Sequence, residues 1–536
     1  MYIGSQSLMK KYDQCLLDNG YTILELVDKA SQCLLKHMNG EYFSLLCGPG
    51  NNGADGLSLA IKLNNLGKKV DVYIFEDQNH LSQANRYYLD LCYEYGIHVV
   101  LLNDDILDEV MDEISHSDII VDAMFGFGLN SSPRGLYQSV IEEINQLYDQ
   151  NIIAIDIPTG LDCNTGTPYQ SVVCATQTIT LSAMKNGFLN PDSISFTGEV
   201  ILEILDVNDV FEEAGLYLLA DDKVVAPMLK SRRFDGHKGD YGRVILIAGC
   251  QDYKGASLLS AKSAVYTGSG VTTVMTTQEV MDSLTVYCPE VTTQLRAPVL
   301  RKEDFEKYNA ILIGCGLGLS IDSYRYVIDV FSLSHQPLVI DADALTILSS
   351  NLDLLKNQER DIILTPHMGE FKRLCDVDNN DDMLFVAKEF ARKHQVVLVL
   401  KGPYTIVTDG QEAYRVFAGN KAMATGGGMG DVLAGMITSL LGQGYAALNA
   451  AVLGVYIHGY AGDRIAEKHY TVIPSVLIER IPQSMNEIKK VILKRLLALN
   501  KCNIAVRTFI STIGEEKVFI FYCTIRRNCY VFFFNT

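Results

Sequence analysis

Short apolar segments recur along the chain, several of them ending in an aspartate or a glycine-rich turn, and a stretch with helical spacing follows most of them. In the first half they are residues 42–47, 69–75, 118–122, 152–156 and 178–181, and in the second half 243–248, 310–313, 338–341, 362–364 and 396–400. This alternation predicts parallel sheets covered by helices, which is an α/β fold. Because 536 residues exceed one ordinary core, we expect at least two such domains.

Composition narrows the range of partners. The net charge of −19 disfavours a nucleic-acid or anionic-membrane binder, so a small molecule is the expected substrate. The 13 cysteines are scattered and contain no C-x-x-C pair, which predicts reduced thiols, neither zinc nor disulfides, and a cytoplasmic protein. No apolar run reaches the ~20 residues of a membrane helix, and the N-terminus lacks a secretion-signal pattern.

The segment 48–56 follows the first apolar strand and precedes a helix that we expect over 57–66. It formally matches G-x-G-x-x-G, a dinucleotide-binding pattern, with an acidic residue on or just after the next strand. The match is weak, because Asp55 would repel a pyrophosphate placed on the turn. Carboxylate and amide oxygens, here from Asp55, Asn51 and Asn52, suit hydroxyl groups or a hard cation better. We therefore predict a substrate and cation site on a Rossmann-like scaffold.

Three aspartates occupy equivalent places at the ends of apolar strands. Asp55, Asp122 and Asp156 are expected to gather at one sheet edge, where ligands of open α/β sheets bind. Each alone could be an ordinary turn or cap residue. Lys185 follows the strand at 178–181, and the residues leave open whether it is a surface lysine or part of the site.

The stretch 424–435 crowds glycines into a turn that opens a small-residue helix. Free N–H groups and the helix dipole make such a turn an anion site. Asp431 stands at its mouth, where a carboxylate could take a proton from a hydroxyl that attacks a phosphate. The alternative is a plain helix cap, which seldom needs so many glycines.

Four segments of the first half, 51–56, 122–128, 156–160 and 185–187, resemble the NAD(P)HX epimerase family. NAD(P)HX is NADH or NADPH that has added water across the ring C5–C6 double bond, and this family interconverts its R and S forms at C6. The resemblance implies a Rossmann-like three-layer domain over residues 1–215. Ala54 stands where the family has glycine, and Thr159 where serine is more usual.

The epimerase resemblance also implies functional residues. Asp156 and Lys185 would be catalytic, and a potassium ion would be held by Asn52, Asp122 and Thr159. The substrate would contact Asn51, Asn52, Gly53, Ala54, Asp55, Gly126, Phe127, Gly128, Leu129, Asn130, Ser131, Ser132 and Asp156.

The second half resembles the NAD(P)HX dehydratase, a ribokinase-like domain, over residues 220–500. The matching pieces are 254–256, 314–318, 341–345, 365–370, 401–402 and 427–431, with Met368 in place of a more usual proline. The resemblance implies that the substrate contacts Ala256, Gly318, His367 and Asp431, the last being the catalytic base. It places the nucleotide at Lys401, Gly402, Pro403, Tyr404, Thr405 and Gly430. Mg²⁺ and ADP are the implied partners, although the sequence itself does not separate ADP from ATP.

The two resemblances together imply a fused repair enzyme that epimerises NADHX and NADPHX and dehydrates the S form with ADP, assembled as a homo-oligomer. One alternative is a vitamin-precursor kinase of the hydroxyethylthiazole or hydroxymethylpyrimidine type, which the fused first domain and the 365–370 turn disfavour. Another is a non-catalytic nucleotide-binding regulator, which the intact aspartates disfavour. The sequence singles out no basic cluster for a 2′-phosphate, so the preference between NADHX and NADPHX stays open.

The last segment, 501–536, differs in style from the rest. Residues 518–522 and 530–534 are aromatic and β-prone, and two arginines separate them. We expect an atypical extra end with no core to join, and an aggregation hazard if it is exposed.

Overall fold

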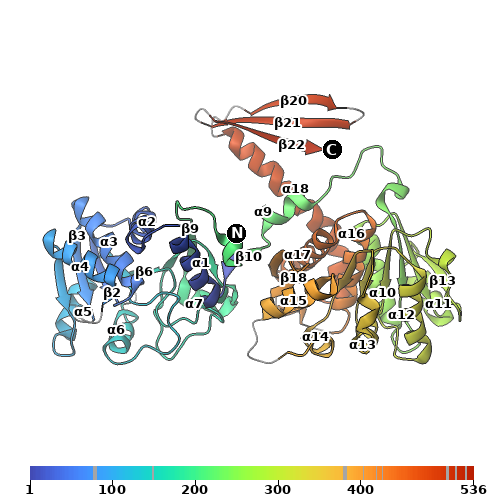
Figure 1. Cartoon of the computed structure of the whole chain (residues 1–536), viewed down its shortest axis with the longest axis horizontal. Coiled ribbons are helices and arrows are strands. Elements are labelled where there is room, and N and C mark those ends of the chain that lie inside the picture. The colour runs from blue at the N-terminus through green and yellow to red at the C-terminus, as the bar shows by residue number, and fades with distance from the viewer. Residues whose placement is uncertain are drawn as a thin grey trace. The chain divides into compact units, whose positions relative to one another are not determined.

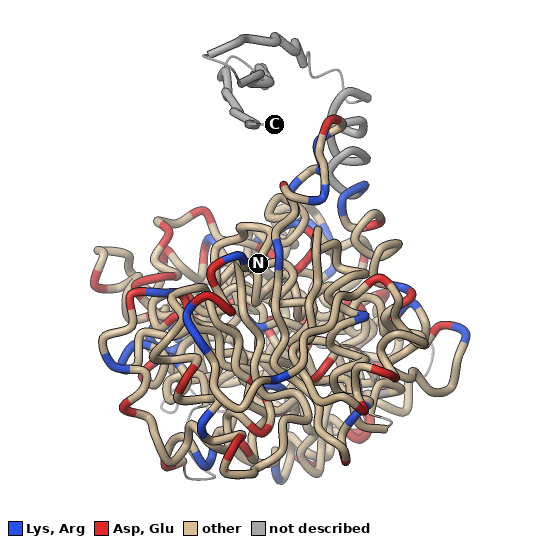
Figure 2. Tube along the Cα trace, turned by 90° about the vertical axis from the view of Figure 1, so that its right-hand side faces the viewer, with Lys and Arg blue, Asp and Glu red and all other residues tan. Residues whose placement is uncertain are grey.

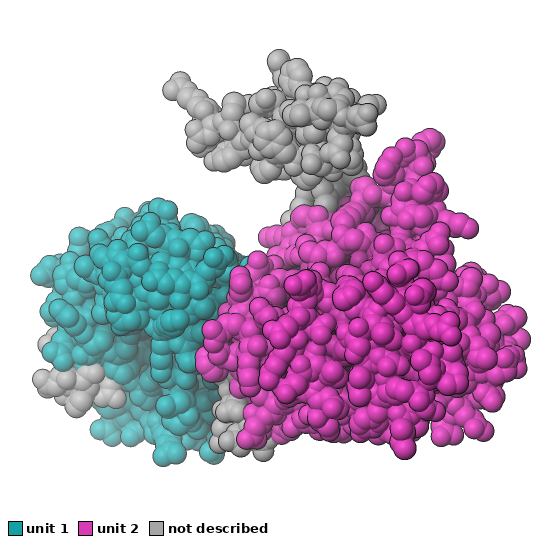
Figure 3. Space-filling view, turned by 45° about the vertical axis from the view of Figure 1, so that its right-hand side comes forward, with its two compact units in different colours: residues 1–218 teal, residues 219–536 magenta. Residues whose placement is uncertain are grey.

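The chain divides into two compact units, residues 1–218 and 219–536 (Figures 1 and 3). The computed structural model describes residues 1–75, 81–147, 150–377, 383–402, 404–417, 419, 421–424, 426–501, 506–513, 516–525 and 528–535. Among these residues no helix is long and apolar enough to span a bilayer. Acidic residues outnumber basic ones by 64 to 45, and Figure 2 shows both signs interspersed along the chain. The local charge at each site is therefore set by the residues of that site rather than by the net charge of the chain.

The first unit is built on a seven-stranded sheet in the order β4-β3-β2-β5-β6-β7-β9, with every neighbouring pair parallel. Its elements are β1 Tyr2–Gly4, α1 Gln6–Asp18, α2 Ile23–Leu35, β2 Tyr42–Cys47, α3 Asn51–Asn65, β3 Lys69–Ile74, α4 Gln83–Glu94, β4 His98–Leu101, α5 Leu107–Ser115, β5 Ile119–Ala123, α6 Leu136–Ile144, β6 Asn151–Ile155, β7 Gln177–Leu181, β8 Met184–Lys185, α7 Ile194–Thr197, β9 Glu199–Glu203, α8 Phe211–Ala214 and β10 Tyr217–Leu219. The short strand β1 pairs with β8 and β10.

Alternate residues of the central strands belong to two separate cores, one on each face of the sheet. On β2, Leu45 packs in a cluster with apolar residues of α2, α3 and α4, whereas Leu46 packs with those of α5 and α6. Strands buried on both faces require the continuous apolar runs that the sequence shows. The predicted three-layer Rossmann-like fold is confirmed.

Helix α3 begins earlier than predicted. It starts at Asn51 rather than Leu57, with Gly50 at its N-cap, so Asn51, Asn52 and Asp55 lie in its first turns. The preceding loop folds tightly onto this helix, since a Cβ on Gly53 would lie 1.9 Å from the Gly48 carbonyl oxygen. Ala54 has helical backbone there, so its Cβ causes no strain.

The second unit contains the sheet order β13-β12-β11-β14-β15-β16-β17-β18-β19, parallel as far as β17 and antiparallel beyond it. Its elements are α9 Asp222–Val225, β11 Arg243–Ile247, α10 Lys254–Thr267, β12 Val271–Thr276, α11 Gln278–Tyr287, β13 Thr292–Leu295, β14 Ala310–Ile313, α12 Ile321–Leu333, β15 Leu338–Ile340, α13 Asp343–Ser349, β16 Ile362–Leu364, α14 Met368–Leu374, α15 Met383–His394, β17 Val397–Leu400, β18 Tyr404–Thr408, β19 Ala413–Phe417, α16 Met429–Gly442, α17 Ala447–Ala466 and α18 Pro474–Lys501. The predicted ribokinase-like α/β unit is confirmed, with a mixed rather than wholly parallel sheet.

The end of the chain forms an antiparallel sheet of β20 Val506–Ile513, β21 Glu516–Ile525 and β22 Asn528–Asn535. The β-prone segments of the sequence lie in β21 and β22. That this end is an atypical extra segment remains a prediction.

Close packing of α10 against α16 fixes the entrance of α16, where the predicted base lies. A Cβ on Gly435 of α16 would come within 2.1 Å of the Ser260 carbonyl oxygen and 2.2 Å of Ser263 Oγ on α10. Only glycine allows this approach, because the first of these neighbours is backbone and cannot rotate away.

We therefore predict that Gly435→Ala lowers the free energy of unfolding by about 1–3 kcal/mol. The matched control is Gly255→Ala on α10, where a Cβ meets no atom within 4 Å and alanine gains up to ~1 kcal/mol of helix propensity. Urea unfolding followed by circular dichroism measures both variants. Equal stability of the two would contradict this account of the packing.

Candidate active sites

A cavity of about 420 Å³ opens at the carboxyl edge of the first unit's sheet. Its wall is made by segments that follow β2, β5, β6 and β7, and by α1 and α2. Strand register explains the convergence, because Cys47 pairs with Ala123 and Ile155 pairs with Ile179. The predicted site residues that line the cavity are Asn51, Asn52, Asp55, Gly126, Phe127, Gly128, Leu129, Asp156 and Lys185.

Lys185 and Asp156 form a buried ion pair in this wall. Lys185 Nζ lies 2.5 Å from Asp156 Oδ1, and the lysine is fully buried. The same ammonium donates hydrogen bonds to the carbonyl oxygens of Leu181 at 3.0 Å and Ala183 at 3.1 Å. Asp156 has φ 69°, a left-handed conformation that is uncommon outside glycine and is often kept at functional sites. The alternative of a surface lysine does not hold in this structure.

Asp122 and Thr159 form a second polar centre in the same unit. The Asp122 carboxylate is fully buried and accepts hydrogen bonds from Thr159 N at 2.8 Å, Thr159 Oγ1 at 2.7 Å and Met124 N at 3.2 Å. Burial raises the pKa of Asp122 to about 6, although these hydrogen bonds oppose the shift. Such a carboxylate is stabilised by a bound cation, and carboxylate, hydroxyl and amide oxygens suit potassium. The residues predicted as its ligands therefore fit the ion.

Several predicted residues are not part of the cavity wall. Gly53 and Ala54 are buried within α3, and residues 130–132 lie in the loop beyond Leu129 without lining the cavity. Asp122 is likewise absent from the wall, so the three strand-end aspartates do not all converge on one cavity.

Asp13 lines the cavity but was missed by the sequence analysis. It lies on α1 together with Met9, Leu16 and Leu17, which also line it. Positions 9, 13, 16 and 17 share one helix face. The sequence signal for Asp13 was therefore an acidic residue on an otherwise apolar helix face. Partial desolvation in the cavity wall, with a further contribution from Asp156, raises the pKa of Asp13 above that of an ordinary carboxyl group.

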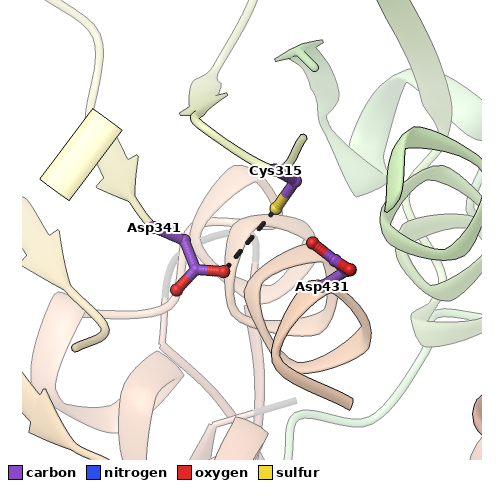
Figure 4. Close-up of side chains that lie close together, drawn as sticks. All are labelled: Cys315, Asp341 and Asp431. Atoms are coloured by element: carbon purple, nitrogen blue, oxygen red, sulfur yellow. Dashed lines mark hydrogen bonds between the residues drawn. The ribbon is translucent and has the colours of Figure 1, made fainter. Parts of the chain in front are cut away.

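In the second unit, the predicted base Asp431 lies in the first turn of α16, which is capped by Gly428 with φ 111°. Asp431, Asp341 and Cys315 come together there, with one ligand-type atom of each within 4.8 Å of the others (Figure 4). Cys315 Sγ lies 3.7 Å from Asp341 Oδ2. Burial and the neighbouring Asp341 raise the pKa of Asp431 to about 7.

Lys401 links three of the strand-end turns. Its Nζ lies 2.9 Å from Asp341 Oδ1 and 3.8 Å from Glu370 Oε2. Burial alone would lower the pKa of Lys401, but these two carboxylates outweigh it and raise the pKa. A Cβ on Gly430 would lie 3.3 Å from the same Nζ, so the 401–405 segment and the entrance of α16 are adjacent.

His367 caps α14 through its ring. Nδ1 accepts hydrogen bonds from Gly369 N at 2.9 Å and Glu370 N at 3.2 Å. The neutral ring therefore carries its proton on Nε2, which is the tautomer that can donate to a ligand.

The other predicted residues of the second unit lie at the same sheet edge. Gly318 has φ 78° and its N–H donates to Asp343 Oδ2 at 2.8 Å, while Ala256 lies in the first turn of α10 beside Gly316. Thr405 Oγ1 donates to the Gly402 carbonyl oxygen at 3.1 Å, next to Tyr404 at the start of β18. Pro403 lies outside the described residues.

Comparison with known proteins agrees with this division. A family model for NAD(P)H-hydrate dehydratase matches residues 244–483, and one for the YjeF-related protein N-terminus matches residues 14–187. The bifunctional NAD(P)H-hydrate repair enzyme Nnr of Coxiella burnetii is 32% identical over 472 residues, covering 86% of this chain and 94% of the relative. The chain belongs to the bifunctional NAD(P)H-hydrate repair family.

A second relative spans most of the chain, and one solved structure is similar to about half of it. The Escherichia coli repair enzyme Nnr is 32% identical over 463 residues, with 84% of this chain and 87% of the relative covered. The ADP/ATP-dependent NAD(P)H-hydrate dehydratase of Bacillus subtilis, co-crystallised with ATP and Mg²⁺, is 30% identical with a TM-score of 0.46, and covers 51% of this chain and 99% of its own. Membership of the repair family decides against the vitamin-precursor kinase.

The raised pKa of Asp431 in this repair-family chain predicts a pH-dependent stability. Its folded pKa of about 7 exceeds the ordinary carboxyl value near 4. Between these values the folded chain holds more protons than the unfolded chain, so the free energy of unfolding falls as pH rises. Asp431→Asn should match the wild type near pH 4 and exceed it above pH 7, by about 1–3 kcal/mol. Urea unfolding across pH 4–8 measures this. A difference that does not change with pH would contradict it.

Proposed function

We propose that the first unit epimerises NAD(P)HX through Asp156 supported by Lys185, and that the second unit dehydrates the S form through Asp431 with ADP. The observation that carries the proposal is the placement of both sets at sheet edges within matched family regions. In NAD(P)HX, C6 bears a hydroxyl beside the ring nitrogen, so acid–base help suffices to labilise that carbon. Asp156 would accept a proton, and Lys185 would hold its carboxylate in place.

Dehydration needs a better leaving group than hydroxide. Asp431 would take the proton of the C6 hydroxyl while that oxygen attacks the terminal phosphoryl group of the nucleotide. Phosphate would then leave C6 as the ring nitrogen lone pair forms a C=N bond, and loss of a proton from C5 would restore the reduced nicotinamide. With ADP the other products are AMP and phosphate. A carboxyl pKa of about 7 suits a base near neutral pH.

Open space at the α16 entrance supports phosphate binding. A Cβ on Gly426 or Gly427 would meet no atom within 4 Å, so a phosphoryl group has room beside the helix N–H groups. Lys401 adds a positive charge beside Gly430. Mg²⁺, when bound with the nucleotide, neutralises its phosphate charge. His367 would donate from Nε2 to the hydrated substrate.

Asp431→Asn should abolish dehydration and leave epimerisation intact, because the two sets of residues lie in separate units. The assay mixes both NADHX epimers with Mg²⁺ and either ADP or ATP, and follows absorbance at the reduced-nicotinamide band. Wild type should restore the whole band, and the variant none of it. Epimerisation by the variant is followed by chromatography of the two forms. Equal loss of both activities would contradict the division, and tight nucleotide binding without turnover would favour the non-catalytic regulator.

The proposed potassium site gives a second test. Thr159→Ala removes an oxygen that contacts Asp122, whereas Thr159→Ser keeps it. Potassium chloride should raise the melting temperature of wild type and Thr159→Ser above that in choline chloride at equal ionic strength. Thr159→Ala should lose most of this increase and also lose epimerisation rate. An undiminished potassium effect in Thr159→Ala would exclude this site.

A further inference from the structure

The ammonium group of Lys185 has no proton to spare for a substrate. A lysine ammonium has three N–H donors. Two of them go to the Leu181 and Ala183 carbonyl oxygens at 3.0 and 3.1 Å, and Nζ also forms an ion pair with Asp156 Oδ1 at 2.5 Å. Giving one of these protons away would break a buried interaction. Lys185 is thus a positioning residue for Asp156, and the proton donor of the epimerase site must be another group in the cavity wall.

Two other carboxyl groups line this cavity, Asp55 on α3 and Asp13 on α1. Asp55 is the more enclosed, and burial raises its pKa well above the ordinary value, which keeps it a hydrogen-bond donor. Asp13 is more exposed than Asp55 and lines the same cavity. It therefore reaches a ligand most freely.

We propose that Asp13 is a catalytic acid–base residue of the epimerase site, working opposite Asp156. The inference rests on the proposed epimerase function and deepens it. The two carboxyl groups line one cavity and come from different elements, α1 and the end of β6. The proposal places the substrate ring between them, with one carboxyl group at each face.

The reaction balances without any further reagent. The Asp13 carboxyl gives its proton to the C6 hydroxyl oxygen, the C6–O bond breaks, and water leaves while the ring nitrogen lone pair forms the C6–N1 double bond. Water then adds to the other face of C6, the π electrons return to nitrogen, and the incoming water loses a proton to Asp156. Exchange with cavity water resets the two carboxyl groups. The opposite epimer reacts with the two roles reversed.

The charges around Asp13 agree with these roles. Asp55, Asp156, Lys185 and Lys10 face the same cavity. Partial desolvation in the cavity wall and the neighbouring Asp156 raise the pKa of Asp13 above that of an ordinary carboxyl group, while Lys185 opposes the shift.

The test compares Asp13→Asn with Asp13→Glu and with Asp18→Asn. Asp18 lies at the end of the same helix, bonds to Gln14 at 2.8 Å and does not line the cavity. Asp13→Asn should lower the epimerisation kcat by about 10²–10⁴-fold with KM changed only a few-fold. Asp13→Glu should retain part of the rate, and Asp18→Asn all of it. Urea unfolding of each variant, followed by circular dichroism, reports whether the first unit remains folded.

A second measurement addresses the step itself. In water enriched in ¹⁸O, wild type should incorporate the label into the C6 hydroxyl at the rate of epimerisation, and Asp13→Asn should not. Full epimerisation by Asp13→Asn, or epimerisation by wild type without label, would overturn the inference while leaving the proposed function in place. A wild type that dehydrates but never epimerises would overturn both.

Discussion

Parallel strand pairing with matched ends determines where both sites lie. In the second unit Ile247 pairs with Ile313, Ile313 with Ile340, and Ile340 with Leu364, so the turns that follow these strands emerge side by side. The same holds in the first unit. Residues far apart in sequence thus meet at one edge, where helix N-termini also point. If one strand slipped by a single residue, its side chains would exchange faces and its turn would leave the site.

Both sites contain several carboxyl groups, and the surroundings of each group differ. Asp156 and Asp341 each have a lysine partner, at 2.5 and 2.9 Å. Asp122 has hydrogen bonds and, as proposed, a cation. Asp13 and Asp431 have raised pKa values instead. A raised carboxyl pKa destabilises the folded chain near neutral pH. It also lets the carboxyl group take up and release a proton there.

The strand and turn pattern could be predicted well from the sequence, because the spacing of hydrophobic residues, apolar runs and glycine-rich turns are all local signals. The sequence placed Asp156 and Asp431 correctly at strand ends and helix entrances. The early start of α3 was wrong, since a glycine-rich run looks like a loop until a neighbouring loop packs against it. Asp13 was missed, because an acid in an apolar helical stripe becomes informative only once the fold shows that the stripe borders a cavity.

The two units reach a common solution from unrelated residues. Each holds a lysine close to a buried aspartate, Lys185 with Asp156 at 2.5 Å and Lys401 with Asp341 at 2.9 Å. Lys185 is saturated by its partners and so contributes field and geometry rather than a proton. A second carboxyl group with a raised pKa also takes part in proton transfer, Asp431 in one unit and Asp13, as we infer, in the other. Because the ion pair and the second carboxyl group are separate, a change in the burial of that carboxyl group need not disturb the ion pair beside it.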